Sequence, residues 1–472
     1  MLLSIILIPF ITALILLFIK DAKKANTIAL VTNAATLAVS IWIAMKGAPD
    51  FNQAWIPALN SQFLLHSDGL AKILVLLTAI SFPVILMSSA SNQIAQKNKF
   101  ISLLLFTQAG LLGVFLAGDA LLFYFFWELA LIPVYFLCSI WGGERRIAVT
   151  FKFFIYTFIG SLMMLAGIIF LYTHSAEPNF LIQNFAHATL TSAQQMTAFV
   201  LFLIAFAIKM PIFPLHTWQP DAYEQSPTPV TMVMSAVMVK MGLYGVIRWL
   251  LPLFPVAAKS AAVVVVDLSV IGVLYASFIA IKQDDIKRFI AYSSIAHIGL
   301  MNAALFAHQA IGVQGVLIQL FSHGLNVLGL WIVADIIEQQ TGTRSMLAMG
   351  GLAKKQPTLA ILLVVFAFAN IALPLTNAFV GEFLIFNGLF QFNPWVAAFA
   401  GVSVILSAIY TLNMVQKVAY CEVSEATQKM NQVNKPAQLV LIILVIIVFV
   451  NGVYPQPLFD ITADTLQQMF VK

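Results

Sequence analysis

The sequence predicts an all-α integral membrane protein with about fourteen transmembrane helices. Apolar residues make up 61% of its 472 residues and charged residues only 9%, whereas an ordinary soluble protein has about 25% charged residues. Apolar stretches long enough to cross a bilayer follow one another along the whole chain, and the basic residues gather in the short segments between them. This composition excludes a soluble enzyme, a disordered protein and a nucleic-acid-binding protein.

The apolar stretches give the expected helices directly. The hydrocarbon core of a bilayer is about 30 Å thick, so a helix needs about 20 apolar residues to cross it. Lysines follow the first stretch rather than precede it, so we expect a transmembrane helix there and not a cleaved signal peptide. No soluble linker interrupts the series, which predicts a single polytopic domain over 1–472. The expected helices cover 2–19, 26–46, 70–90, 100–117, 120–141, 151–173, 196–218, 229–251, 260–281, 287–306, 311–336, 358–389, 394–420 and 437–455.

The positions of the basic residues support this number of helices. Cytoplasmic segments next to transmembrane helices are enriched in Lys and Arg. With the N-terminus outside, seventeen of the 24 Lys and Arg residues fall on the cytoplasmic side and five on the outer side, while Lys209 and Lys240 lie within helices. We therefore expect a multi-pass membrane protein with both termini on the outer side.

Prolines interrupt two of the expected helices. Pro211 and Pro214 break the seventh, and Pro374 breaks the twelfth. Proline removes a backbone donor and clashes with the preceding turn, and lipid cannot satisfy the freed carbonyls, so such breaks lie inside the protein or beside a water-lined path. The two breaks are five helices apart and hence oppositely oriented. This spacing predicts two inverted five-helix repeats, helices 4–8 within 100–251 and helices 9–13 within 260–420.

Few ionisable side chains fall deep within the expected helices, where a charge costs at least about 2.5–3.5 kcal/mol. Glu128 in the fifth helix and Lys209 in the seventh have opposite charges. They could form a fixed ion pair that sets the helix register, or a pair whose opening and closing changes the proton affinity of the lysine. Lys240 lies far from both ends of the eighth helix, where it either exchanges protons or extends toward an interface.

Two histidines and a further acid complete this set. His297 and His323 fall in adjacent helices, and Glu382 follows the break in the twelfth helix by about two turns. One histidine in a helix is usually a core residue, but two together with neighbouring serines predict a hydrated chain that relays protons. The acid–base groups have no nucleophile–base pair, phosphate loop or nucleotide-binding stretch beside them, so the sequence predicts proton conduction.

We expect no functional role for several other polar residues. We interpret Asp267 as structural, and we expect Asp335 and Glu338, near the end of their helix, to be solvated. Cys138 and Cys421 form no CxxC motif, which excludes a disulfide framework, a zinc knuckle and an iron–sulfur site. We therefore expect neither a metal nor a cofactor site on these residues.

Four stretches resemble the antiporter-like membrane subunits of respiratory complex I. The resemblance extends over about residues 100–420 and is greatest to the subunit M family of bacterial NADH–quinone oxidoreductases, which includes mitochondrial NADH dehydrogenase subunit 4. Subunits L and N usually have lysine in the twelfth helix, where subunit M has glutamate, as at Glu382. Gln219 departs from the usual leucine. The four stretches are His-Thr-Trp-Gln-Pro-Asp-Ala-Tyr-Glu-Gln-Ser-Pro-Thr (216–228), Val-Lys-Met-Gly-Leu-Tyr-Gly-Val-Ile-Arg (239–248), Asp-Ile-Lys-Arg-Phe-Ile-Ala-Tyr-Ser-Ser-Ile-Ala-His (285–297) and Phe-Val-Gly-Glu-Phe (379–383).

The resemblance implies a proton-translocating membrane subunit of an NADH–quinone oxidoreductase, driven by quinone reduction elsewhere in the complex. It implies a Glu128–Lys209 pair and a central Lys240. It also implies other membrane subunits as partners, including sister antiporter-like subunits, and a location in the bacterial inner (cytoplasmic) membrane, where the outer side is the periplasm. No cofactor or metal is expected on this chain, since FMN, iron–sulfur clusters, NADH and quinone belong to other subunits. The resemblance further implies linking histidines and a terminal acid, which fall on His297, His323 and Glu382.

Three alternatives remain open at this point. The same polar residues could serve a subunit of a sodium/proton antiporter, although Glu382 argues against it. His297 and His323 could ligate a haem in a membrane cytochrome. The chain could also be a structural scaffold in which the ion pairs never rearrange.

Overall fold

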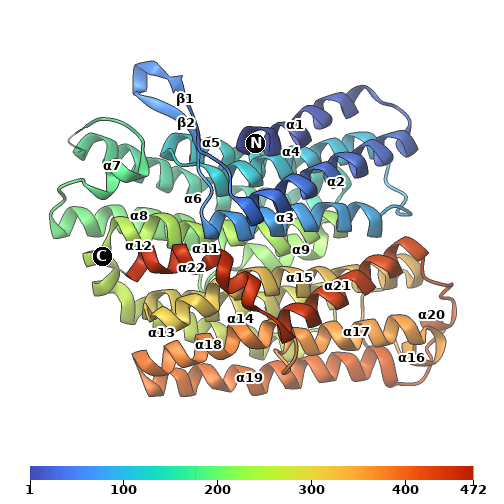
Figure 1. Ribbon diagram of the computed structural model, residues 1–472. Coiled ribbons are helices and arrows are strands. Elements are labelled where there is room, and N and C mark those ends of the chain that lie inside the picture. Colours follow the sequence, from blue (N-terminus) through green and yellow to red (C-terminus); the bar gives the residue numbers. More distant parts are fainter. Residues whose placement is uncertain (176, 471–472) are drawn as a thin grey trace.

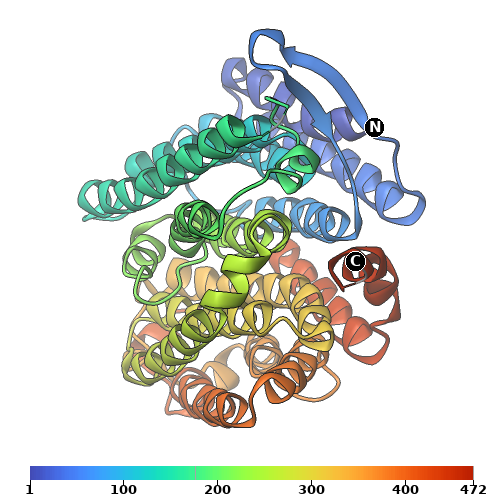
Figure 2. The same ribbon diagram turned by 90° about the vertical axis from the view of Figure 1, so that its left-hand side faces the viewer.

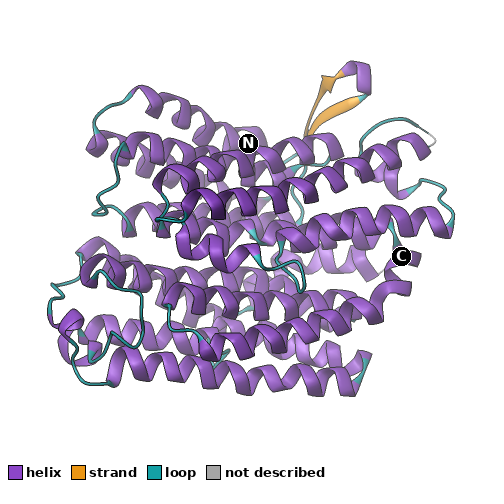
Figure 3. Cartoon of the chain, turned by 180° about the vertical axis from the view of Figure 1, so that it is seen from behind, coloured by secondary structure: helices purple, strands orange, loops and turns teal. Residues whose placement is uncertain are grey.

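The computed structural model describes residues 1–175 and 177–470 and is almost entirely helical (Figure 3). A 3₁₀ turn, η1, covers Pro57–Leu59, and three π-helical segments are η2 (Met234–Met238), η3 (Val246–Leu250) and η4 (Gln416–Tyr420). The α-helices are α1 (Leu2–Phe18), α2 (Ala22–Lys46), α3 (Gly69–Ser88), α4 (Lys97–Leu116), α5 (Ala120–Trp141), α6 (Arg146–His174), α7 (Ile182–Ala186), α8 (Ser192–Lys209), α9 (Trp218–Gln225), α10 (Thr228–Val233), α11 (Lys240–Gly245), α12 (Leu251–Leu253), α13 (Pro255–Lys282), α14 (Ile286–Ala307), α15 (Ala310–Thr341), α16 (Leu352–Lys355), α17 (Pro357–Asn370), α18 (Asn377–Phe392), α19 (Pro394–Val415), α20 (Glu425–Gln428), α21 (Lys435–Val453) and α22 (Gln456–Phe470).

The long helices run side by side along one direction, so the bundle has two ends (Figure 1). The earlier helices, blue to green, form one half, and the later helices, yellow to red, form the other, as the view in Figure 2 also shows. One end holds Asp68 and Arg248 and is called the Asp68 end below. The other holds Glu224 and Arg288 and is called the Glu224 end. The candidate site residues, which include Lys240 and His323, lie between these two ends.

The helices agree with a membrane-spanning fold. Twelve helical stretches among the described residues are long and apolar enough to cross a bilayer, and two shorter apolar helices cover Leu2–Leu16 and Pro357–Asn370. These fourteen elements fall on the fourteen predicted ranges. The all-α membrane fold is therefore confirmed, while the span number of fourteen and the inverted repeats within 100–251 and 260–420 stay predictions.

The predicted break in the seventh helix is confirmed. Helix α8 ends at Lys209, and α9 begins at Trp218. The indole N–H of Trp218 donates to the carbonyl oxygen of Ile208 at 2.9 Å, and Nζ of Lys152 donates to that of Thr217 at 2.9 Å. Side chains thus satisfy backbone groups at the interruption, which lipid could not do.

The break in the twelfth helix is also confirmed. Between α17 and α18 the backbone turns through two residues with left-handed dihedrals, Ala372 (φ 55°) and Leu375 (φ 76°), a conformation that is rare outside glycine. The amide of Asn326 donates to the carbonyl oxygen of Ala369 at 3.1 Å. The interruption is therefore stabilised from the neighbouring helix α15, which also carries His323.

Two elements were not predicted. Strands β1 (Phe51–Ile56) and β2 (Ser61–Leu65) form an antiparallel hairpin that projects from the bundle (Figures 1 and 3). Helix α22 lies against α3 and α15 and buries Leu458, Thr462 and Thr465. A search for apolar stretches of 20 residues cannot detect either element, because the strands are short and α22 is polar on one side.

Candidate proton-transfer site

Lys240 lies in the middle of the fully buried helical stretch Thr228–Leu253 and is itself 0% exposed. The π-helical segment η2 directly precedes it. There the N–H of Val239 donates to the carbonyl oxygen of Met234 at 3.1 Å instead of that of Ser235. The Ser235 carbonyl oxygen accepts a hydrogen bond from Nζ of Lys240 at 2.8 Å. The widened turn thus gives a buried ammonium group a backbone acceptor, and π-helical turns are frequent at functional sites.

His323 is the second partner of Lys240. Its Nδ1 atom lies 2.8 Å from Nζ of Lys240, and its side chain is buried. The next residue, Gly324, lets α15 lie directly against η2, because a Cβ atom at Gly324 would be only 3.0 Å from the carbonyl oxygen of Ala236. Close helix packing through a small residue therefore brings these two side chains within hydrogen-bond distance.

His297 on α14 and Glu382 on α18 form a second contact. Nδ1 of His297 lies 2.9 Å from Oε1 of Glu382, which also accepts a hydrogen bond from the amide of Gln319 at 3.2 Å. The rings of His297 and His323 are 5.6 Å apart between centroids and tilted by 55°. The structure therefore places Lys240, His323, His297 and Glu382 in one series across α11, α15, α14 and α18.

The hydrogen-bonding state of the two rings suits this series. Each histidine uses Nδ1 for its charged neighbour, Lys240 or Glu382. The Nε2 atoms of His297 and His323 are buried and have no hydrogen-bond partner in the described protein. Buried polar atoms in proteins are normally satisfied by protein or by ordered water. Nε2 of each ring is therefore the nitrogen that is free to accept or donate a further hydrogen bond.

The expected contact between Glu128 and Lys209 is not made in this structure. Across the described residues, no oxygen of Glu128 lies within 4.0 Å of Nζ of Lys209, and both Glu128 Oε1 and Lys209 Nζ are buried without a hydrogen-bond partner. Nζ of Lys209 lies 5.3 Å from the ring centroid of Trp127, next to Glu128 in sequence. The structure therefore does not show a fixed Glu128–Lys209 ion pair, and a pair that opens and closes stays a prediction.

Buried polar side chains lie on several elements near α8, which ends at Lys209, and α11, which begins at Lys240. A Cβ atom at Gly242 would lie 2.7 Å from Cβ of Met210, so α11 lies against the end of α8. Several buried polar atoms on α4, α5, α9 and η2 have no partner in the described protein. Of these elements, α4 and η2 contact α11, and α5 contacts α4. Such atoms are normally satisfied by ordered water. They belong to Gln108, Trp127, Gln219, Tyr223 and Ser235.

Comparison with known proteins identifies the family. The family profile described as NADH:quinone oxidoreductase/Mrp antiporter, transmembrane, matches residues 117–409. NADH-quinone oxidoreductase subunit M of Rhodobacter capsulatus is 36% identical over 467 residues, which cover 95% of this chain and 90% of the relative. The chain belongs to the subunit M family. NADH-quinone oxidoreductase subunit M of Escherichia coli K12 is 34% identical, and the alignment covers 99% of this chain and 97% of that relative.

A solved structure supports the assignment to the subunit M family. A chain of respiratory complex I from Thermus thermophilus superposes with a TM-score of 0.92 at 27% identity, covering 99% of this chain and 100% of that chain. This protein is therefore a multi-pass membrane subunit of the complex I type, with other membrane subunits as partners. The two relatives named above are subunits of NADH–quinone oxidoreductases, so the sodium/proton antiporter interpretation is not favoured.

The structure corrects one minor expectation about this family member. Asp335 is not solvated but 3% exposed, and its Oδ2 accepts a hydrogen bond from the amide of Asn92 at 2.9 Å. Glu338 is partly exposed and pairs with the buried Lys287 at 2.6 Å. The expectation for Asp335 failed because α15 extends to Thr341, beyond the predicted helix end. Asp267 is exposed near the middle of α13.

An ion-pair network at the Glu224 end was missed. Glu224 on α9 lies 3.0 Å from Arg145, 2.8 Å from Arg288 and 3.5 Å from Arg344. Asp221 on the same helix lies 2.9 Å from Arg288. These contacts attach the short helix after the first break to the loop before α6, to α14 and to the segment after α15. Glu224 and Asp221 fall in the 216–228 stretch, but sequence alone does not show their partners.

Several neighbours of the series were also missed. Gln319 lies one turn before His323 on α15 and donates to Glu382, so its helical spacing is a signal that sequence could have given. Ser293 lies 3.2 Å from the hydroxyl of Tyr410 and accepts from Asn370 at 2.9 Å. These contacts join α14 to α17 and α19 near the second break.

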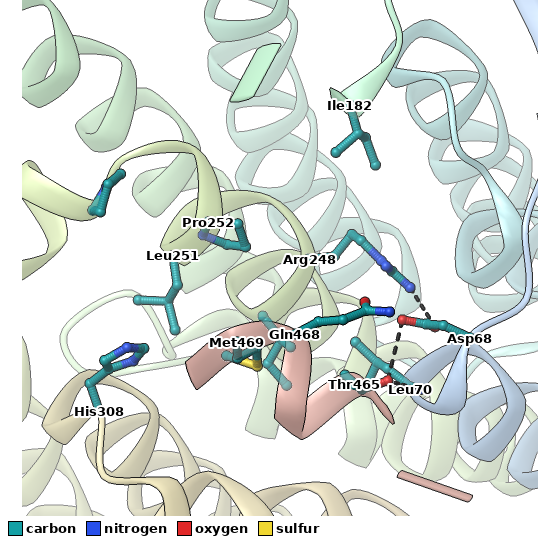
Figure 4. A pocket seen from close by; sticks show the side chains of 12 residues that line it. Asp68, Leu70, Ile182, Arg248, Leu251, Pro252, His308, Thr465, Gln468 and Met469 are labelled. Carbon is teal, nitrogen blue, oxygen red and sulfur yellow. Dashed lines mark hydrogen bonds and ion pairs between the residues drawn. The ribbon is translucent and has the colours of Figure 1, made fainter. Parts of the chain in front are cut away.

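A cavity of about 510 Å³ opens at the Asp68 end, beneath α22 (Figure 4). Asp68 pairs there with Arg248 at 2.5 Å and accepts a hydrogen bond from Thr465 at 3.3 Å. Burial alone would raise the pKa of Asp68, but Arg248 and the backbone amide of Ala71 hold this pKa below its ordinary value. The guanidinium of Arg248 lies 5.7 Å from the ring centroid of Tyr244, one turn after Lys240. Polar and charged groups thus extend from Lys240 toward this cavity.

Proposed function

We propose that this chain translocates protons across the membrane as the subunit M component of an NADH–quinone oxidoreductase. The observation that carries the proposal is the connected series of Lys240, His323, His297 and Glu382. Its two close contacts, 2.8 Å and 2.9 Å, lie within reach of direct proton transfer. A charged series in the interior of an apolar bundle is costly and is typical of proton relays in membrane proteins.

We assign Nδ1 of His323 as an acceptor and Nδ1 of His297 as a donor, and this assignment determines how a proton would move. The ammonium of Lys240 gives a proton to Nδ1 of His323, and that ring releases another from Nε2. Nε2 of His297 accepts it, and this ring passes its Nδ1 proton to the carboxylate of Glu382. Each imidazole accepts on one nitrogen and donates from the other, which is the property that makes histidine a proton shuttle. Turning the rings or reprotonating from the other side resets the series.

Glu128 and Lys209 would control the supply to Lys240. In this structure Lys209 lies over Trp127 and away from its acid, which corresponds to an open pair. Closing the pair would stabilise a proton on Lys209, and opening it would favour release toward Lys240 through the polar side chains between them. Moving one charge through 100 mV costs about 2.3 kcal/mol, which equals less than two pKa units. A modest rearrangement of one ion pair is therefore sufficient.

The redox chemistry would take place on other subunits. We infer that this chain binds no FMN, iron–sulfur cluster, NADH or quinone, and that quinone reduction elsewhere changes the Glu128–Lys209 pair. The short contacts of His323 with Lys240 and of His297 with Glu382 support a proton relay, and we propose this role rather than haem ligation. An absorption spectrum of the purified chain tests this inference, since a Soret band would contradict it.

The proposed location is the bacterial inner membrane, with both termini and the Asp68 end on the periplasmic side. The seventeen basic residues assigned to the cytoplasmic side support this orientation. The Arg-rich network around Glu224 lies at the opposite, proposed cytoplasmic end. Cysteines introduced at the two termini and labelled with a membrane-impermeant maleimide in whole cells would show the orientation, because only outward-facing cysteines react.

The function is tested in membrane vesicles that contain the assembled complex. Lys240→Ala and Glu128→Ala are compared with Lys99→Ala and Glu144→Ala, which change exposed residues of the same types. We expect the first two variants to lose most proton uptake driven by NADH oxidation, and the controls to keep the wild-type rate. Wild-type pumping in both Lys240→Ala and Glu128→Ala would refute the mechanism.

A further inference from the structure

Helix α13 presents an ionisable residue to the outside of the bundle. The helix has 28 residues, and Asp267 lies close to its middle, where its side chain is exposed. Its neighbours one turn away on the same face are Val263 (58% exposed), Val264 (60%) and Ile271 (52%). The opposite side of α13 packs against α14 and α19. A carboxylate thus projects from an otherwise apolar face at the depth of the hydrocarbon core.

The chain itself does not satisfy this carboxylate. Within 1–175 and 177–470, no basic nitrogen lies within 4.0 Å of Asp267, and its side chain makes no hydrogen bond there. The nearest polar side chains on this face of α13 are those of Lys259, Ser260 and Tyr275, about two turns away in either direction. Ionisable side chains at this depth almost always face a protein interior or a partner group, because lipid solvates them poorly.

The surrounding face is well suited to a helix. Exposed apolar side chains follow the α-helical repeat along α13 on both sides of Asp267, from Val256 to Phe278. The face is continuous, and it lies beside the first helix break, since Tyr275 contacts the ring of Phe213 at 5.1 Å between centroids. A partner helix seated here would cover Asp267 and the outer side of that break together.

A second copy of this chain does not fit. Two-fold packing of this face on itself would bring two Asp267 side chains toward each other at the same depth, which is unfavourable for like charges. The chain also offers no basic side chain at this depth, because its two mid-helix lysines, Lys209 (2% exposed) and Lys240 (0%), are buried. The partner that complements this face is therefore a different chain.

We propose that this face of α13 binds a transmembrane helix of another protein chain, and that a basic side chain of that helix pairs with Asp267. Charge complementarity selects the basic group, because a carboxylate removed from water is stabilised by a cation hydrogen-bonded to it. This proposal rests on the proposed function in one respect, because both require that the chain is part of a membrane complex. It assigns a structural role to a residue that lies outside the Lys240–Glu382 series.

The first experiment measures association rather than pumping. The complex is purified through a tag on this chain carrying Asp267→Leu, Asp267→Asn or the matched apolar change Val264→Leu, and the co-purifying chains are quantified by mass spectrometry. We expect both Asp267 variants to lose at least half of one specific chain, while Val264→Leu retains it. Wild-type retention of every chain in both Asp267 variants would overturn the proposal. Lys240→Ala, which should stop pumping but retain all chains, separates a failure of this contact from a failure of the proposed function.

A second experiment probes the assembled complex in two ways. Carboxyl labelling uses the wild-type chain, so that misfolding of a variant cannot decide its outcome, and cross-linking uses a variant with one introduced cysteine. Dicyclohexylcarbodiimide modifies carboxyl groups that face lipid. We expect Asp267 to be protected from it in the complex, and a modified Asp267 would overturn the proposal. A photo-reactive benzophenone attached at Val264→Cys should cross-link to a different protein chain. Cross-links only to lipid, or only between copies of this chain, would likewise contradict the proposal.

Discussion

Nζ of Lys240 lies 2.8 Å from Nδ1 of His323, although 83 positions separate the two residues in sequence. Lys240 belongs to the first predicted repeat (100–251) and His323 to the second (260–420). The contact therefore joins the two halves of the chain at one hydrogen bond. A proton that reaches Lys240 from the first half has a direct acceptor in the second, and this is where we expect the path to be most sensitive to change.

The two histidines should be individually essential for transfer. His297→Gln and His323→Gln keep a hydrogen-bonding side chain, but an amide does not accept a proton on one atom and release it from another. We expect proton uptake in vesicles to fall by on the order of 10²-fold in each variant. His174→Gln, at a helix end away from the series, is the control and should pump normally. Pumping by His297→Gln at the wild-type rate would exclude that ring from the path.

The close packing of α15 on α18 should be necessary for the Glu382 contacts. A Cβ atom at Gly315 would lie 2.6 Å from the carbonyl oxygen of Gly381, so Gly315→Ala must push the two helices apart. We expect a loss of about 1–3 kcal/mol in stability together with reduced pumping. Gly401→Ala is the control, because nothing lies within 4 Å of its added Cβ. Thermal unfolding in detergent measures the first effect, and equal melting temperatures for the two variants would contradict the packing argument.

The network around Glu224 should hold α9 in place. Glu224→Gln removes the charge that faces three arginines, and since those arginines are partly exposed we expect a loss of only about 1–2 kcal/mol. Tryptophan fluorescence should report it, because Trp218 begins the same helix. Glu144→Gln, an exposed acid outside the network, should be neutral. If high salt abolishes the difference between wild type and Glu224→Gln, the loss is electrostatic; a difference that salt leaves unchanged would argue against this origin.

The Asp68–Arg248 pair should make stability depend on acid pH. The folded-state pKa of Asp68 lies below its ordinary value, so the pair contributes stability that is complete above the unfolded pKa of about 3.9 and is lost as the pH falls through the lower folded pKa. We expect Asp68→Asn to be less stable than wild type at neutral pH and to show a weaker loss below about pH 4. Acid titration of unfolding in detergent measures this, with Asp464→Asn on α22 as control. Parallel pH curves for wild type and Asp68→Asn would contradict the assignment.

The membrane architecture and the members of the site could be predicted from the sequence because both depend on local composition. Apolar length locates the helices, proline locates the breaks, and a charged residue within an apolar stretch stands out wherever it lies. The hairpin Phe51–Leu65 and helix α22 escaped this reasoning, since neither needs 20 apolar residues. The burial of Asp335 escaped it as well, because a residue near a helix end is solvated only if no neighbour covers it.

The order of the site residues could not be predicted. Sequence placed His297 and His323 in adjacent helices without showing that one contacts Glu382 and the other Lys240. It left open whether Glu128 and Lys209 form a fixed pair or one that opens, and only the structure shows Trp127 beside the ammonium group. It treated Asp267 as structural without showing that its side chain faces outward, because the direction of a side chain depends on how α13 rotates against α14 and α19.

The sequence by itself determined that the chain spans a membrane, where it breaks, and which few side chains have an ionisable group in its interior, because the cost of burying charge and unpaired backbone acts residue by residue. Only the tertiary structure decided which of those groups touch. Contacts such as Lys240–His323 depend on helices lying against each other to within a fraction of an ångström, at glycines such as Gly324 and Gly315. This fit results from the packing of all the helices together, and a local sequence pattern does not specify that packing.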